Sequence, residues 1–344
     1  MQVDIRPAAT TTPFLAPWWL RNAHLQTIFA KYLSPKSKLC TDAETFHLSD
    51  GDEIQLNWSH RLSTSDKRPL VVLLHGLAGD IHSHYIQGLI AALKQHDLPC
   101  VLMHFRGCNG RPNKLARAYH SGDTADLREV IAMLQQRYPQ MPLCAVGFSL
   151  GANVLVKYCG EQAQHNPLRV AVAVCPPLSL AACAKRINQG SSKIYQTYLL
   201  NRLKKATLAK LAEHADFPLP LSAAKIHAMR SIEEFDEHYT APIHGFKNAK
   251  DYYQRASGMA YLKSIKVPTL IIHAKDDPFL SDDVIPRPAD LSPAIEYQLC
   301  LNGGHVGFVS GKQPFKPVFW LNQRIPSFIL EQLTIAFAAK TAGQ

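Results

Sequence analysis

Six short apolar runs recur along this chain, and segments with helical periodicity separate them. The first three runs are bounded by proline or glycine, which is typical of strands. Strands buried on both faces are apolar throughout, and helices fill the gaps, so this order predicts an α/β fold with a mostly parallel central sheet flanked by helices. The expected strands are Leu70–Leu74, Cys100–Phe105, Leu143–Val146, Val170–Cys175, Thr269–His273 and Glu296–Leu301.

Helices are expected in the gaps between these strands. One of them begins at Asp123, which stands ahead of an amphipathic apolar series and is expected to cap it. A segment that alternates around Asp50 and Gly51, Phe46–Trp58, predicts an antiparallel hairpin leading into the sheet. The expected helices are Tyr85–Gln95, Asp123–Arg137, Leu150–Gly160 and Phe328–Ala339.

One gap is far longer than a crossover between parallel strands needs. About 90 residues separate Cys175 from the strand that begins near Val267. Apolar residues stand there among many lysines and arginines, which favours helices with one apolar and one basic face. We therefore expect a helical lid at 178–240, inserted into an α/β core of residues 46–177 and 241–344. Residues 1–45 are expected to form an N-terminal extension.

The chain is basic, with 37 Lys and Arg against 27 Asp and Glu. Such a charge suits anionic lipids, acidic substrates or nucleic acid. The basic residues form no run of five, however, and no RNA-binding motif or zinc-finger spacing occurs. We expect a solvated basic surface and no nucleic-acid partner. Nowhere do about 18 apolar residues follow one another, so no transmembrane segment is expected, while peripheral membrane contact stays open.

Cysteine usage and the first residues indicate a soluble cytoplasmic protein. The eight cysteines are scattered without a C-x-x-C pair, several of them inside apolar runs, and are expected to be reduced. Met1–Leu20 shows no secretion signal, because Pro13 and Pro17 interrupt its apolar residues. Neither a G-x-G-x-x-G nor a G-x-x-x-x-G-K-[ST] motif occurs, so no nucleotide cofactor is expected.

The strongest local signal is Gly147-Phe148-Ser149-Leu150-Gly151, a G-x-S-x-G motif between an expected strand and an expected helix. A serine on such a sharp turn has a strained backbone, and the flanking glycines avoid collisions with neighbouring elements. The motif therefore predicts that Ser149 is a nucleophile. The backbone N–H of Leu150, at the start of the helix, is free to stabilise an oxyanion, and the helix dipole adds to that effect.

A second signal is the sequence His-Gly-Leu-Ala-Gly, which begins at His75 after an earlier strand. This is the place at which a second oxyanion donor is expected. Leu77 N–H is the candidate, since Gly76 and Gly79 let the loop approach a reacting carbonyl. A glycine-rich turn without this role is the alternative interpretation.

A serine hydroxyl needs a neighbouring base, and the base needs a third group to hold its tautomer. Two carboxylates, Asp276 and Asp277, follow the apolar run at 269–273, and either could orient a histidine. We prefer Asp277, because the residue before the turn-forming Pro278 stands clear of the strand. His305 lies in a glycine-rich loop after the last strand, which keeps the order serine, acid, histidine.

Four further histidines lie near expected strand ends or loops on the same side of the sheet. Each could line the pocket. A metal site built from them is not expected, because no H-E-x-x-H spacing occurs. These residues are His75, His104, His120 and His273.

Seven motifs together resemble the YheT-type branch of the α/β-hydrolase superfamily, the AB hydrolase 4 family, which includes mammalian abhydrolase-domain lipid hydrolases. The likeness covers nearly the whole chain and rests on His24-Leu25-Gln26-Thr27, His75-Gly76-Leu77, His104-Phe105-Arg106-Gly107-Cys108, Tyr119-His120-Ser121-Gly122, Gly147-Phe148-Ser149-Leu150-Gly151, Asp276-Asp277-Pro278-Phe279 and Gly303-Gly304-His305-Val306-Gly307-Phe308. The resemblance implies an α/β-hydrolase fold and a triad of Ser149, Asp277 and His305. It also implies carboxylic-ester hydrolysis, of short acyl chains in bacterial members and of acylglycerols or phospholipids in larger relatives.

Three functions are compatible with these residues. We expect a serine hydrolase that cleaves a small-molecule ester or lipid through an acyl-enzyme on Ser149, without a cofactor. An acyltransferase with the same triad is the first alternative, and the H-x-x-x-x-D pattern from His75 to Asp80 has been linked to it in the same branch. That pattern carries little weight, because it recurs by chance in a chain with 16 histidines. A non-catalytic membrane-surface binding protein that uses the basic lid is the second alternative.

Overall fold

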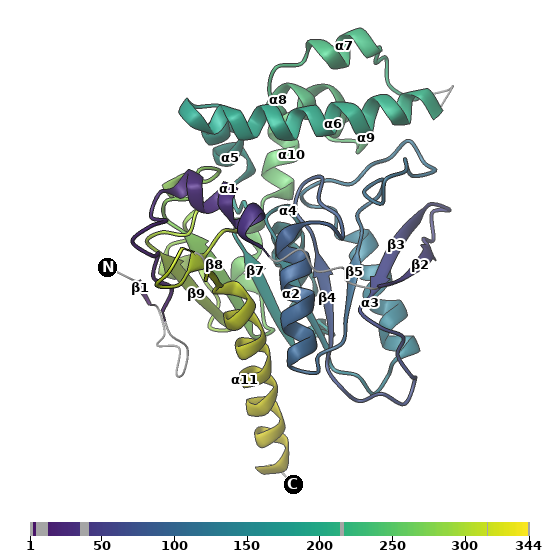
Figure 1. Ribbon diagram of the computed structural model, residues 1–344. Helices are drawn as coiled ribbons and strands as arrows, with labels where there is room; N and C mark the ends of the chain where they lie inside the picture. Colours follow the sequence, from purple (N-terminus) through teal and green to yellow (C-terminus); the bar gives the residue numbers. More distant parts are fainter. Residues whose placement is uncertain (1–2, 5–12, 35–40, 214–216, 315, 343–344) are drawn as a thin grey trace.

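A mostly parallel sheet forms the centre of the protein, as the apolar runs predict (Figure 1). The structure is a computed structural model that describes residues 3–4, 13–34, 41–213, 217–314 and 316–342. The order of the nine strands is β1-β9-β8-β7-β6-β4-β5-β3-β2. They are β1 (Val3–Asp4), β2 (Asp42–His47), β3 (Glu53–Trp58), β4 (Leu70–Leu74), β5 (Cys100–Met103), β6 (Leu143–Phe148), β7 (Val170–Val174), β8 (Thr269–Ala274) and β9 (Ile295–Cys300).

The pairing of the strands explains the apolar runs. Strands β5, β4, β6, β7, β8 and β9 pair in parallel, whereas β1, β3 and β2 are antiparallel at the edges. Every residue of β4 to β8 is buried, because the sheet is covered on both faces. All six expected strands and the hairpin of β2 and β3 are confirmed, although the hairpin begins at Asp42 rather than Phe46.

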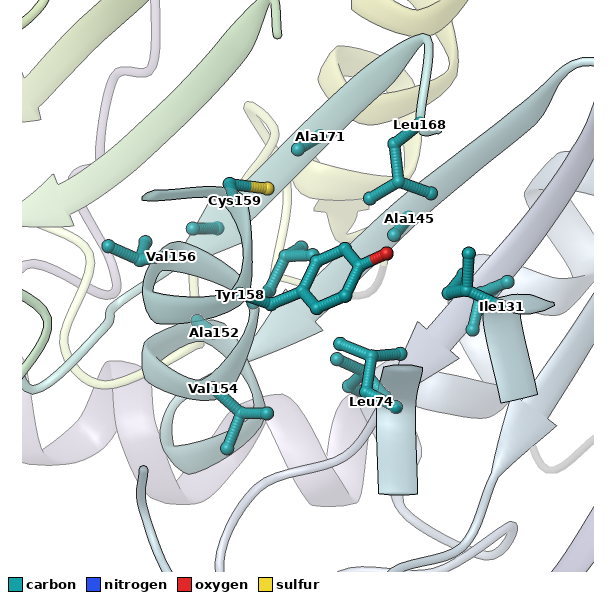
Figure 2. Packing of buried hydrophobic residues seen from close by; sticks show 14 of the residues in the cluster. Leu74, Ile131, Ala145, Ala152, Val154, Val156, Tyr158, Cys159, Leu168 and Ala171 are labelled. Atoms are coloured by element: carbon teal, nitrogen blue, oxygen red, sulfur yellow. The ribbon is translucent and has the colours of Figure 1, made fainter. Parts of the chain in front are cut away.

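Helices cover the two faces of the sheet, and each face has its own apolar core. Helices α2 (His84–Gln95) and α11 (Leu321–Ala342) pack on one face, and α3 (Ala125–Arg137) and α4 (Leu150–Gln162) pack on the other. Figure 2 shows the second core, in which Tyr158 of α4 lies near Ile131, Leu74 and Ala145. A separate small ribbon consists of β10 (Val309–Ser310) and β11 (Val318–Phe319).

Helix α11 begins at Leu321, so the expected start at Phe328 is wrong. Pro326 lies inside the helix, where it removes one backbone hydrogen bond and would ordinarily mark a boundary. Leu321 and Ile325 are buried against the sheet on the N-terminal side of this proline. Their burial stabilises the first turns of the helix in spite of the lost hydrogen bond.

Asp123 is not the cap of α3, which begins at Ala125 with Thr124 in the capping position. The Asp123 carboxylate instead accepts a hydrogen bond from Arg117 at 2.8 Å. An aspartate two residues before a helix start can bond either the helix N–H groups or another donor, and here the partner is the guanidinium of Arg117. The amphipathic spacing located the helix correctly, but it does not identify the capping residue.

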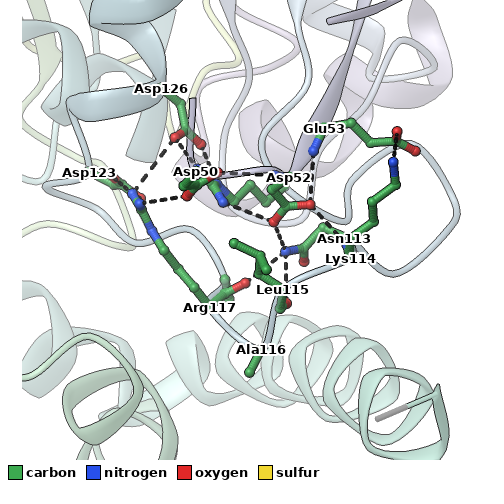
Figure 3. A network of polar contacts seen from close by, with 12 residues as sticks. Asp50, Asp52, Glu53, Asn113, Lys114, Leu115, Ala116, Arg117, Asp123 and Asp126 are labelled. Carbon is green, nitrogen blue, oxygen red and sulfur yellow. Dashed lines mark hydrogen bonds and ion pairs between the residues drawn. The ribbon is translucent and has the colours of Figure 1, made fainter. Parts of the chain in front are cut away.

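A buried polar network joins the hairpin to the loop that precedes α3 (Figure 3). Arg106, which is 2% exposed, contacts the carboxylates of Asp50 at 2.8 Å, Asp52 at 2.9 Å and Asp126 at 2.7 Å. Burial opposes the ionisation of Asp52, but hydrogen bonds from Asn113 and from backbone N–H groups outweigh it and lower the pKa of Asp52. The network holds the loop of residues 106–124 in place beside the sheet.

A set of helices between β7 and β8 lies beyond the ends of the central strands, in the upper part of Figure 1. The long helix α6 crosses this region, and Lys210 on it donates to the carbonyls of Ala116 and Arg117 at 3.1 and 2.6 Å. Among the residues that the structure describes, no helix has the length and apolar character needed to cross a bilayer. The helices are α5 (Leu180–Ile187), α6 (Lys193–Glu213), α7 (Ala223–Ala228), α8 (Ile232–Phe235), α9 (Ala241–Ile243) and α10 (Ala249–Ala256).

The segment expected only as an N-terminal extension contains helix α1 (Ala23–Leu33). Asn22 caps it, since the side-chain oxygen accepts from the N–H groups of His24 and Leu25 at 2.9 and 3.1 Å. Cys40 lies outside the described residues, and Cys100, Cys108, Cys144, Cys159, Cys175 and Cys183 are free thiols.

Candidate active site

Ser149 occupies the sharp turn between β6 and α4. Its backbone has φ +51° and ψ −118°, a region that residues with a Cβ rarely adopt. The turn is held by the Ser149 N–H, which donates to the Val174 carbonyl of the neighbouring strand at 2.8 Å. Because strand and helix meet at one residue, the hydroxyl projects from the end of the sheet.

The two glycines of the motif allow this turn to be made. A Cβ at Gly147 would lie 2.5 Å from the Gly151 carbonyl oxygen, and a Cβ at Gly151 would lie 2.5 Å from the His75 carbonyl oxygen. Both distances are far shorter than any real contact, and the atoms concerned are backbone atoms that cannot turn away. Only glycine fits at either position.

The structure brings Ser149, His305 and Asp277 together in one chain of hydrogen bonds. His305 Nε2 lies 2.9 Å from Ser149 Oγ, and His305 Nδ1 lies 2.7 Å from Asp277 Oδ2. The Asp277 residue is 2% exposed. Phe279 stacks on the imidazole, with ring centroids 4.0 Å apart, and fixes its plane. The arrangement suits a base that takes the serine proton while a carboxylate holds its tautomer.

Asp276, the alternative acid, faces the histidine loop from another side. Its carboxylate accepts from the Gly304 N–H at 3.0 Å and from the Asn302 side chain at 3.3 Å. Burial raises the pKa of Asp276. These contacts shape the loop, whereas the contact to the imidazole belongs to Asp277, so the geometry favours Asp277 as the orienting acid.

Helix α1 supports the loop that carries His305, a role that the sequence motif did not reveal. The His305 N–H donates to Thr27 Oγ1 at 2.9 Å. A Cβ at Gly304 would lie 2.5 Å from the Ala23 carbonyl oxygen, and a Cβ at Gly307 would lie 2.5 Å from that of Gln26. The loop glycines therefore let the backbone of α1 approach closely.

Gln26 joins α1 to the segment that follows His305. Its side-chain amide donates to the carbonyls of Leu20 and Val309, both at 2.8 Å, and its oxygen accepts from the Val309 N–H at 2.8 Å. The side chain is completely buried, so these bonds replace water. The only sequence signal for this role is that Gln26 and Thr27 belong to the first of the seven motifs.

The loop after β4 places the second expected oxyanion donor close to the serine. A Cβ at Gly76 would lie 3.3 Å from Ser149 Cβ, so the loop passes close to the serine side chain. Tyr85 and Tyr119 hold the loop through their hydroxyls, which accept from the N–H groups on either side of Leu77, each at 2.9 Å. Within the described parts of the chain, the N–H groups of Leu77 and Leu150 have no acceptor.

The four other histidines form no hydrogen bond with Ser149 in the part of the chain that the structure describes. His75 is buried, accepts from the Phe105 N–H at 3.1 Å through Nε2, and contacts the Gly76 carbonyl at 2.7 Å through Nδ1. Burial lowers the pKa values of His75 and His120 to about 3, and that of His273 to about 4. His75 is therefore a structural residue whose two ring nitrogens are both engaged.

Cys175 lies close to Asp277 and His305. The three residues offer ligand atoms within 4.8 Å of one another, the one such group found in the described residues. Burial, reinforced by the negative charge of Asp277, raises the pKa of the Cys175 thiol well above its ordinary value. Asp277 and His305 already bond each other, and His305 also contacts Ser149 Oγ, so the geometry of these groups suits proton transfer.

Known proteins resemble the chain in sequence and in fold. Residues 69–312 match the family described as alpha/beta hydrolase fold. The chain is 40% identical to the Escherichia coli (strain K12) protein named "Putative esterase YheT" over 96% of either chain. It is 30% identical to monoacylglycerol lipase of Saccharomyces cerevisiae over 72% of this chain and 56% of the relative.

Solved structures of other proteins have a similar fold. An esterase of Pyrococcus furiosus matches with a TM-score of 0.55 and 17% identity, over 88% of this chain and 93% of that chain. At this identity the likeness shows the fold alone, and the relatives supply the esterase and lipase character. The central sheet, the covering helices and the family match agree, and the chain belongs to the α/β-hydrolase family, among its esterase- and lipase-type members.

Proposed function

We propose that this protein is a serine hydrolase that cleaves carboxylic esters through an acyl-enzyme on Ser149. The observation that carries the proposal is the unbroken series of hydrogen bonds from Asp277 through His305 to the Ser149 hydroxyl, at 2.7 and 2.9 Å. Similarity to an esterase-type protein and to a monoacylglycerol lipase supports an ester or acylglycerol as substrate.

In the first step, Ser149 Oγ attacks the ester carbonyl while His305 Nε2 takes the hydroxyl proton. Negative charge develops on the carbonyl oxygen, where the N–H groups of Leu77 and Leu150 would stabilise it. The tetrahedral intermediate then collapses, the bond to the alcohol oxygen breaks, and His305 returns the proton to the departing alkoxide. The Asp277 carboxylate stabilises the imidazolium during this exchange.

In the second step, water takes the place of the alcohol. His305 accepts a proton from the water as its oxygen attacks the acyl carbonyl, and the same two N–H groups stabilise the oxyanion. Collapse returns the proton to Ser149 Oγ and releases the carboxylic acid. The helices of residues 178–240 would act as a lid over this site, since Tyr195 of α6 contacts Phe279 with ring centroids 4.9 Å apart.

The H-x-x-x-x-D pattern from His75 to Asp80 does not support an acyltransferase with His75 as base. Both ring nitrogens of His75 have backbone partners, and burial lowers the pKa of His75 to about 3. Transfer to an alcohol rather than to water would use the same three residues as hydrolysis and would differ only in the acceptor.

Hydrolysis of a soluble ester such as p-nitrophenyl butyrate tests the proposal. We expect Ser149→Ala to lower kcat by at least about 10³-fold, because the variant lacks the nucleophile. Ser63→Ala, a substitution of a solvent-exposed serine in a loop, serves as the matched control and should keep full activity. Unchanged turnover by pure, folded Ser149→Ala would contradict the proposal.

A further inference from the structure

Helix α1 turns a stripe of large apolar side chains toward solvent. Leu25, Ile28, Phe29 and Tyr32 have the spacing i, i+3, i+4, i+7, which places them on one face of the helix. Each is between 40% and 73% exposed. The opposite side of α1 supports the His305 loop, so packing within the fold does not account for the exposed stripe.

The neighbouring end of α6 adds two further exposed apolar residues. Ile194 is 69% exposed and Tyr198 is 52% exposed, and they lie one turn apart. The two helices are joined because His24 of α1 contacts Tyr195 Oη at 3.0 Å and Ser191 Oγ at 2.9 Å. We define the apolar rim as the six exposed residues Leu25, Ile28, Phe29, Tyr32, Ile194 and Tyr198.

The two helices that carry the apolar rim are almost free of acidic residues. Helix α1 contains no Asp or Glu, and residues 162–212, which include α5 and nearly all of α6, contain none either. Arg21, Lys31 and Lys193 are exposed next to the apolar rim. Apolar side chains flanked by cations suit a layer of acyl chains under anionic headgroups. A second copy of the same surface would instead bring like charges together.

The apolar rim lies close to the reacting groups. Tyr195, the residue after Ile194, packs on Phe279, and Phe279 stacks on the His305 imidazole. Thr27, on the inner side of α1, binds the His305 backbone. Tyr195 and Phe279 therefore link the helix that carries Ile194 and Tyr198 to His305 of the triad.

We propose that the apolar rim docks the protein on an anionic lipid surface and presents the Ser149 site to it. The identification of lipid esters as substrates rests on the proposed function, whereas docking itself depends only on the apolar rim and its cations. Burial of an exposed isoleucine or tyrosine in the lipid interface would supply the affinity, and the cations would supply the preference for anionic lipids.

Flotation of the full chain with vesicles tests this proposal. We expect the protein to float with vesicles of phosphatidylcholine mixed with phosphatidylglycerol, and much less with phosphatidylcholine alone. Ile194→Gln and Tyr32→Gln remove apolar surface without changing the charge and should each weaken the partition coefficient by about tenfold. Ile335→Gln, at a 55% exposed isoleucine in the C-terminal half of α11, is the matched control and should bind as the wild type does.

The outcomes separate docking from catalysis. Binding that Ser149→Ala retains, and that the two rim variants lose with unchanged thermal unfolding, supports docking even if no ester is cleaved. The proposal is overturned if the wild type binds neither vesicle, or if Ile335→Gln weakens binding as much as Ile194→Gln. It is also overturned if the wild type is a dimer that Ile194→Gln converts to a monomer, because a second copy would then cover the apolar rim.

Discussion

Neighbouring aspartates have separate tasks beside the histidine. Asp277 contacts the imidazole nitrogen at 2.7 Å, whereas Asp276 contacts the backbone N–H of Gly304 at 3.0 Å. Asp277 also accepts from the Phe279 N–H at 2.8 Å, which helps to fix the carboxylate beside Nδ1 of the imidazole. One carboxylate thus orients the side chain of His305, and the other shapes the loop that carries it.

The two aspartates are therefore expected to differ sharply when each is changed to asparagine. Asp277→Asn places an amide against His305 Nδ1, favours the wrong tautomer and should lower kcat by about 10⁴-fold. Asp276→Asn keeps an oxygen that can accept from the Gly304 N–H, so we expect a loss below about tenfold. Steady-state kinetics on a soluble ester measures both. Equal losses in the two variants would exclude Asp277 as the sole orienting acid.

Thr27 is expected to position the histidine without touching the substrate. Thr27→Val removes the acceptor of the His305 N–H and should lower kcat by about tenfold with little change in KM, since about one hydrogen bond is lost. Thr27→Ser keeps the hydroxyl and should restore the rate. A Thr27→Ser variant as slow as Thr27→Val would mean that the methyl group, not the hydrogen bond, matters.

The turn from strand β6 into helix α4 depends on close contact between its backbone and that of the loop after β4. Gly151→Ala would place a Cβ 2.5 Å from the His75 carbonyl and should lower the free energy of unfolding by about 1–3 kcal/mol. Gly88→Ala is the matched control in helix α2, because its new Cβ would meet the movable side chain of Asn322. Chemical denaturation compares the two, and a Gly151→Ala protein as stable as the control would disprove the close contact.

Most of the strands and helices could be predicted from local patterns in the sequence. The apolar runs predicted β4 to β9 closely, because a strand that is buried on both faces is apolar along its own length. The turn at Ser149 was recognisable because the sequence predicts a strand before it and a helix after it. The support of His305 by α1 is a contact between positions 27 and 305, which no local pattern reports. Helix α11 was expected to begin too late because burial of Leu321 and Ile325 outweighs the local effect of Pro326.

Across the whole molecule, the Arg106 network connects parts that are distant in the chain. Arg106 contacts Asp50 and Asp52 of the hairpin and Asp126 of α3, and Arg117 contacts Asp123 in the same region. Two carbonyl oxygens of the loop held there also accept hydrogen bonds from the Lys210 ammonium group of α6. The network thereby links the sheet to the helices inserted after β7.

Removal of the central guanidinium is expected to destabilise the entire domain. Arg106→Gln leaves several carboxylates close together and poorly solvated, so the free energy of unfolding should fall by about 3–5 kcal/mol. Arg287→Gln breaks an exposed pair with Asp290 and should leave the unfolding midpoint unchanged. Urea denaturation followed by circular dichroism measures both variants. Unchanged stability of Arg106→Gln would show that the carboxylates tolerate one another without it.

The central claim is that Ser149 is an activated nucleophile, and covalent labelling tests it most directly. We expect a fluorophosphonate to add one phosphonyl group to the folded protein, with peptide mass spectrometry locating the adduct on Ser149. Ser149→Ala should stay unlabelled, and His305→Gln should react far more slowly, because the base that removes the proton is missing. An unlabelled wild-type protein, or an adduct at any other residue, would contradict the account.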